Sequence, residues 1–134
     1  MTGERGVGIG DREAVTASAV DYIESWLDGD VERMARCLHP DLVKRSPAED
    51  VEAAGAEAAA CPLDTLGRAE MVAATAEGRG TRYARPYEVS VLDVFRDIAT
   101  VRVLSSAYMD YLHLARCGDR WLLVNVLWQR RPGR

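Results

Sequence analysis

Two side chains that could exchange a proton, Asp110 and His113, stand three residues apart in an apolar segment near the end of the chain. In an extended strand, residues an odd number apart point to opposite faces. Asp110 shares its face with Leu112 and Leu114, so if these leucines face a core, Asp110 points inward as a base or a hydrogen-bond acceptor. If the other face is the inner one, His113 and Tyr111 become the ligand-binding residues.

His39 is the second candidate for catalytic proton transfer, because an imidazole gains or loses a proton near neutral pH. Its alternative role is to cap the last carbonyls of a helix. Lys44 and Arg45 are adjacent in a predicted strand, so only one of them reaches the interior. We choose Arg45, because a guanidinium suits a planar anion or carbonyl, with surface charge as the alternative.

Asn125 and Trp26 complete the set of candidate ligand-binding residues. Asn125 lies within an aliphatic run, where its amide can donate and accept hydrogen bonds to orient a ligand. The alternative is a buried amide paired with the backbone or with Asp110. Trp26 is predicted to form a pocket wall, although aromatic residues at helical spacing more often pack in a core.

Composition excludes several functional classes. The net charge is -4, with 17 basic and 21 acidic residues spread along the chain, so no nucleic-acid footprint is predicted. The three cysteines include no CxxC pair, which predicts reduced thiols in a cytoplasmic protein without a metal site. No apolar run is long enough for a signal peptide or a membrane span. We expect no cofactor and no membrane partner.

The first half of the chain predicts helices. Apolar residues recur at helical spacing over 11–27, and Gly29 can adopt the left-handed conformation that ends a helix. A second amphipathic pattern covers 31–39 and ends before Pro40, because the residue before proline disfavours helical geometry. The two helices therefore meet at a tight corner.

The middle of the chain is less regular. Residues 42–46 predict a short edge strand, because Pro47 lacks the donor that a central strand needs. The alanine-rich segment 48–62 has helical composition but little to bury, so a helix or a mobile flap is expected there. A third amphipathic helix is predicted over 63–77, with Gly78 as its stop.

The second half of the chain predicts four strands. Residues 87–95 and 98–106 form two of them, and the arms of a hairpin within 108–128, turning at Gly118, form the others. Helices followed by strands predict an α+β fold, with the helices on one face of an antiparallel sheet. Both faces of the last strand are apolar, which predicts that a second copy of the chain covers the outer face.

Two runs carry a family resemblance: YIESWLDGDVERMARCLHPDLVKRS at residues 22–46 and DYLHLARCGDRWLLVNVLW at residues 110–128. With the order of elements, they resemble the nuclear transport factor 2-like superfamily, and within it the SnoaL-like and putative lumazine-binding proteins. The resemblance implies a cystatin-like cone, in which N-terminal helices pack on a curved antiparallel sheet around a pocket. We expect a flexible N-terminus over 1–10, one domain over 11–129 and a basic tail over 130–134.

The resemblance is compatible with several functions, because proteins that share a fold can differ in function. The ketosteroid isomerases of this superfamily use an aspartate before a proline, and the matching residue is Ser46, which argues against steroid isomerisation. We predict a small-molecule-binding protein that, if an enzyme, acts as a cofactor-independent cyclase, dehydratase or isomerase. Asp110 or His39 would move the proton, while Arg45 or Asn125 stabilises charge on oxygen. The alternative is a non-catalytic dimeric binding or assembly module.

Overall fold

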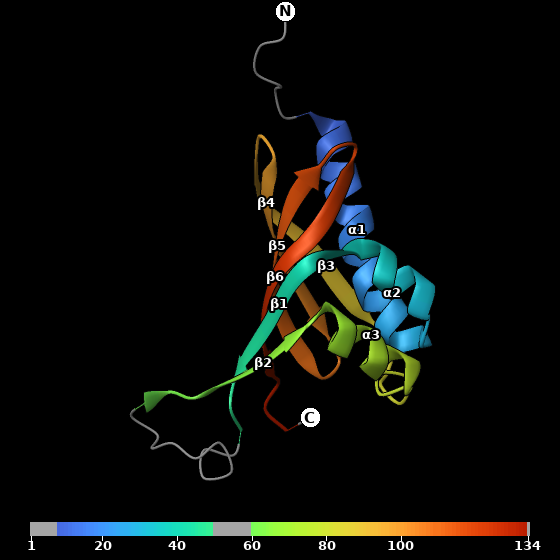
Figure 1. Cartoon of the computed structure of the whole chain (residues 1–134), viewed down its shortest axis with the longest axis vertical. Helices are drawn as coiled ribbons and strands as arrows, with labels where there is room; N and C mark the ends of the chain where they lie inside the picture. Colours follow the sequence, from blue (N-terminus) through green and yellow to red (C-terminus); the bar gives the residue numbers. More distant parts are fainter. Residues whose placement is uncertain (1–7, 50–59, 134) are drawn as a thin grey trace, which may run out of the picture.

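The computed structural model describes residues 8–49 and 60–133, which form helices packed on one face of a six-stranded sheet (Figure 1). The order of strands across the sheet is β2-β1-β6-β5-β4-β3. In chain order, the elements are α1 (Ile9–Asp28), α2 (Val31–Cys37), β1 (Leu38–Pro47), β2 (Leu63–Gly67), α3 (Arg68–Ala76), β3 (Tyr87–Phe95), β4 (Ile98–Ser105), β5 (Tyr108–Cys117) and β6 (Arg120–Arg130). The predicted α+β class is confirmed.

The corner between α1 and α2 has the predicted chemistry. Gly29 closes α1 with a left-handed φ of 68°, and the Asp30 side chain caps α2 by accepting a hydrogen bond from Arg33 N at 3.1 Å. The Arg33 guanidinium then binds Asp21 at 2.7 Å and Glu24 at 2.9 Å, which fixes α2 against α1. Within 8–49 and 60–133, no helix has the length and apolarity needed to cross a membrane.

Two predictions for the middle of the chain are wrong. β1 is not an edge strand: it lies inside the sheet, antiparallel to β2 and parallel to β6. Residues 63–67 form the edge strand β2 rather than the start of a helix, and α3 begins only at Arg68. Their pairing with β1 overrides local preference, and Ala48 N donates to Pro62 O at 2.9 Å beyond it. Residues 50–59 of the predicted helix or flap lie outside the described residues.

A β-bulge in β6 determines which side chains face the helices. His113 of β5 pairs with Asn125, whereas the next residue, Leu114, pairs with Leu123, so Val124 is an extra residue in β6. A bulge resets the alternation of a strand. Consequently Trp121 and Leu123 before the bulge are buried, and so is Val126 after it, while Asn125 is exposed.

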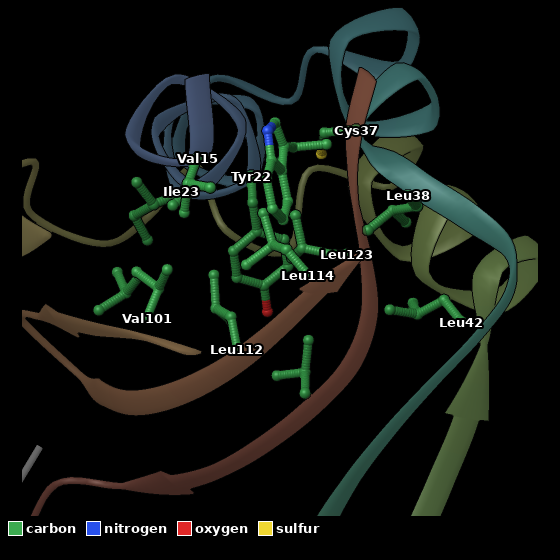
Figure 2. Close-up of a cluster of buried hydrophobic side chains, with 14 of the residues drawn as sticks. Val15, Tyr22, Ile23, Cys37, Leu38, Leu42, Val101, Leu112, Leu114 and Leu123 are labelled. Carbon is green, nitrogen blue, oxygen red and sulfur yellow. The ribbon is translucent and has the colours of Figure 1, made fainter. Parts of the chain in front are cut away.

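The core lies between the helices and the inner face of the sheet. Figure 2 shows Val15 and Ile23 of α1 facing Val101, Leu112 and Leu114 of the sheet. Tyr22 belongs to the same cluster, and its hydroxyl oxygen points from α1 toward the sheet. This orientation brings the Tyr22 hydroxyl into a mainly apolar layer, where it needs a hydrogen-bond partner.

The loop after α3 packs tightly on α1. Gly80 is buried, and a Cβ atom added to it would lie 2.3 Å from the Trp26 carbonyl oxygen and 2.6 Å from the indole. Such distances are shorter than any real contact of a side-chain carbon, so only glycine allows this approach.

We expect Gly80→Ala to lower the free energy of unfolding by about 1–3 kcal/mol, because the added methyl group displaces Trp26 or the loop. Urea denaturation measures the change. Gly10→Ala is the control: nothing lies within 4 Å of its added Cβ, and alanine favours the helix that contains it. Equal stability of the two variants would contradict the close approach.

Candidate functional site

A cavity of about 230 Å³ lies where α1, the loop after α3 and the inner face of the sheet meet. Its apolar walls include Ile23, Leu66 and Met71. Aromatic side chains also line it: Tyr22, Trp26, Tyr83, Tyr108 and Trp128. Edge-to-face contacts of Tyr108 with Tyr83 and with Trp128, both at 5.2 Å between ring centroids, fix part of this wall.

Three polar side chains form a hydrogen-bonded chain inside the cavity. The Tyr22 hydroxyl of α1 donates to Asp110 Oδ2 of β5 at 2.7 Å. Lys44 Nζ of β1 donates to the same Tyr22 oxygen at 2.7 Å. The tyrosine therefore bridges a carboxyl group and an amine that come from different strands, and all three side chains line the cavity.

Lys44 enters the cavity because of the register between β1 and β6. It pairs with the buried Val126, whereas Arg45 pairs with the exposed Leu127. Of the two adjacent cations, the inward one is therefore Lys44, and our choice of Arg45 is wrong. Arg45 is exposed on the outer face and lines none of the cavity.

Aromatic rings surround the Lys44 amine. Nζ lies 5.2 Å from the centroid of the Tyr22 ring, 5.7 Å from Trp26 and 5.4 Å from Trp128. The negative faces of such rings attract a cation, but they do not replace the hydration that burial removes. The surroundings therefore hold the amine in place while making its charge costly.

Burial has the largest effect on the pKa values of these three hydrogen-bonded side chains. It raises the pKa of Asp110, against the opposing effects of the Lys44 charge and the Tyr22 hydrogen bond. It lowers the pKa of Lys44, against the opposing effect of Asp110. Burial and the neighbouring Asp110 also raise the pKa of Tyr22. The site thus favours uncharged forms of the acid and the amine more than water does.

Arginines gather around the rest of the cavity wall. Arg79, Arg82 and Arg130 line it, and the Arg130 guanidinium lies 5.2 Å from the Tyr108 ring centroid. Burial raises the pKa of Tyr83, but hydrogen bonds with Tyr108 and the arginines outweigh burial and lower this pKa to about 8. Arg130 was expected in a basic tail, yet it is the last residue of β6.

Of the residues predicted from sequence, Asp110 and Trp26 line the cavity. His39 does not: it is the second residue of β1, and its Nδ1 accepts a hydrogen bond from Asp41 N at 2.9 Å. The expected position of His39 at the end of a helix is therefore wrong, because α2 already ends at Cys37. His39 does not share the cavity with Asp110.

Asn125, Tyr111 and His113 face away from the cavity. Asn125 is exposed opposite His113 on the outer face, and Tyr111 is 45% exposed on that face. Our expectation that Asn125 lies in the pocket is wrong, because the bulge at Val124 puts Asn125 on the face opposite to that of the buried Leu123. The register also settles the choice left open for β5: Asp110 points inward and His113 outward.

Sequence reasoning missed Tyr22, Lys44 and Arg130 as site residues. Tyr22 precedes Trp26 by four residues, so the two lie on one helix face. This spacing was a signal in the sequence that Tyr22 could line the same pocket as Trp26. Arg130 follows Trp128 by two residues in an extended strand, which also places both on one face. Only the pairing of β1 with β6 identifies Lys44.

The family described as putative lumazine-binding matches residues 10–129. Among solved structures, an NTF2-like protein of unknown function from Silicibacter pomeroyi is 16% identical, with a TM-score of 0.71, over 93% of this chain and 100% of that one. An NTF2-like protein of unknown function from Shewanella baltica is 12% identical, with a TM-score of 0.71, over 96% of this chain and 100% of that one. A ketosteroid isomerase-like protein from Erwinia carotovora is 17% identical, with a TM-score of 0.65, over 92% and 98%. These identities show the fold alone. No curated protein matches the sequence significantly.

We expect Asp110→Asn to change how stability depends on pH. Asparagine still accepts the Tyr22 hydrogen bond but cannot ionise. Since the folded-state pKa of Asp110 is raised, the folded wild type binds more protons than the unfolded chain above about pH 4. Its free energy of unfolding should therefore fall relative to the variant as pH rises through the raised pKa, by about 1.4 kcal/mol per unit of pKa difference.

Urea denaturation between about pH 4 and pH 8 measures this trend. Asp41→Asn is the matched control, because the Asp41 side chain is exposed in β1 and outside the cavity. No comparable trend is expected for it. A wild type that gains stability relative to Asp110→Asn over this range would show that Asp110 is held as a charged partner of Lys44.

Proposed function

Because the chain belongs to the putative lumazine-binding family and has an NTF2-like fold, we propose that its cavity binds a small, partly apolar molecule and transfers protons to or from it. The observation that carries this proposal is the Tyr22 hydroxyl between Asp110 and Lys44, inside a cavity lined by aromatic rings. Aromatic walls with a few convergent polar groups are typical of ligand sites.

The walls favour a flat molecule with a polar group. Trp26 and Trp128 supply apolar surface for its body, while Lys44, which has more than one N–H group, can donate a hydrogen bond to an oxygen such as a carbonyl. The arginines that line the cavity attract a carboxylate or another anionic group. An aromatic carbonyl acid therefore has the three properties that the site can recognise.

The chemistry that the site supports is cofactor-independent proton transfer. As a carboxylate, Asp110 can take a proton from carbon beside a carbonyl, since its raised pKa makes it a stronger base than an exposed aspartate. A hydrogen bond from Lys44 Nζ would stabilise the negative charge that then develops on the carbonyl oxygen. This division of roles suits a cyclase, a dehydratase or an isomerase.

Phenylpyruvate in deuterated water tests this function, because it combines an aromatic ring, a carboxylate and exchangeable protons beside a carbonyl. We expect the wild type to quench its tryptophan fluorescence on binding and to accelerate exchange of the methylene protons, measured by proton NMR. Asp110→Asn should slow the protein-dependent exchange by about 10²-fold or more, because it removes the acid–base group.

Asp41→Asn should leave both binding and exchange unchanged, because it removes an exposed carboxylate outside the cavity. Binding with exchange that is indifferent to Asp110→Asn would reject the catalytic part and leave a binding protein. Absence of binding would reject the proposed class of ligand.

A second candidate function is a non-catalytic dimeric binding or assembly module, favoured by apolar side chains on the outer face of the sheet. Phe95 is 64% exposed, Ile98 60% and Leu127 51%, and Leu127 pairs across the strands with the exposed Tyr111. Large exposed apolar side chains on one face of a sheet are typical of a surface covered by another chain. A second copy would cover it by two-fold pairing.

We expect the wild type to be a dimer by light scattering after gel filtration, and Tyr111→Glu with Leu127→Glu to be a monomer, because the interface would then bury unpaired carboxylates. Phenylpyruvate binding should persist in the monomer, since neither residue lines the cavity. A monomeric wild type would reject the dimer.

A further inference from the structure

We propose that Lys44 forms a reversible imine with the carbonyl group of a molecule bound in the cavity. The inference rests on the proposed ligand-binding function and adds a covalent step to it. Its ligand class is aldehydes and ketones that carry an aromatic body and a carboxylate.

Lys44 is the only lysine of the chain, although the sequence has 17 lysine and arginine residues in total. The other basic positions, all arginine, include those elsewhere on the cavity wall. An arginine cannot replace a lysine in this chemistry, because a guanidinium stays protonated and is no nucleophile at neutral pH. The one primary amine on a side chain thus lies in the cavity.

The contacts of Nζ fit a reactive amine better than a structural ion pair. In the described part of the chain, no carboxylate lies within ion-pair distance of Nζ, whereas Arg33 binds two carboxylates and Arg130 binds one. The oxygen partner of Nζ is the neutral Tyr22 hydroxyl, and Met71 Sδ lies 3.7 Å away. Burial in such surroundings favours the unprotonated amine, which is the form that attacks a carbonyl.

Asp110 and Tyr22 supply the proton transfers that imine formation needs. Nζ attacks the carbonyl carbon, and the electron pair of the carbon–oxygen π bond moves to oxygen. Nζ then loses two protons, the carbonyl oxygen gains two and leaves as water, and a carbon–nitrogen double bond remains. The Asp110–Tyr22 hydrogen bond, which ends 2.7 Å from Nζ, can carry these protons between nitrogen and oxygen.

The ionised Asp110 also stabilises the protonated imine. Protonation of the imine nitrogen creates a cation at the position of Nζ, close to the Tyr22, Trp26 and Trp128 rings. The carboxylate at the far end of the Tyr22 hydrogen bond balances this charge within the cavity. Lys44, Tyr22 and Asp110 therefore take part both in the attack on the carbonyl group and in stabilising the imine that results.

The probe is 4-carboxybenzaldehyde, an aromatic aldehyde with a carboxylate and no exchangeable proton beside its carbonyl. The wild-type protein is incubated with it near neutral pH and reduced with sodium cyanoborohydride, and the adduct is located by intact mass and peptide mapping. We expect one adduct per chain at Lys44, forming at least about tenfold faster than the adduct at the N-terminal amine. Because Lys44 is the only lysine, mapping identifies it in the wild type without any variant.

Lys44→Arg keeps a cation in the cavity and should lose this adduct. Tyr22→Phe should slow its formation about tenfold or more while tryptophan quenching by the probe persists, because it interrupts proton transfer and leaves the apolar wall. Quenching without an adduct at Lys44, or an adduct no faster than at the N-terminus, would overturn the imine and leave the proposed binding function intact. Absence of both quenching and adduct would overturn the two together.

Discussion

The hydrogen bond between Tyr22 and Asp110 is the interaction on which the candidate site depends. It connects the first helix to the fifth strand through the middle of the core, and it gives a buried carboxyl group its partner. Without that partner, the carboxyl group would be desolvated and unpaired, which is strongly destabilising. Lys44 then completes the chain from a third element. The structure and the proposed chemistry therefore rely on the same three atoms: Asp110 Oδ2, the Tyr22 hydroxyl oxygen and Lys44 Nζ.

Local patterns in the sequence predict most of the fold. Helical spacing and the Gly29–Asp30 corner define α1 and α2, and alternation with the turn at Gly118, whose φ is 68°, defines the last hairpin. The errors arise where distant pairing decides. Residues 63–67 become a strand because β1 lies beside them, and Pro47 is tolerated because it stands at the end of that pair. Local preference carries no information about either neighbour.

The candidate site is less predictable than the fold, for a physical reason that Lys44 and Asn125 illustrate. In a strand, a shift of one residue exchanges the inner and outer faces. The bulge at Val124 makes that shift inside β6, so a correct rule of alternation places Asn125 on the wrong side. The choice between Lys44 and Arg45 likewise depends on register with a strand at the other end of the chain. Asp110 escapes this problem because its neighbours Leu112 and Leu114 mark the inner face.

The parallel pairing of β1 with β6 has a consequence for how the protein reaches its folded state. Residues 43–45 contact residues 125–127, so a loop that includes most of the chain must close before these strands meet. Contacts between such distant segments slow folding, because their entropic cost precedes their energetic gain. The contact that places the Lys44 amine beside Tyr22 and Asp110 therefore carries a large loop-closure cost. A fragment without β1 or without β6 would lack the pairing that positions Lys44 in the cavity.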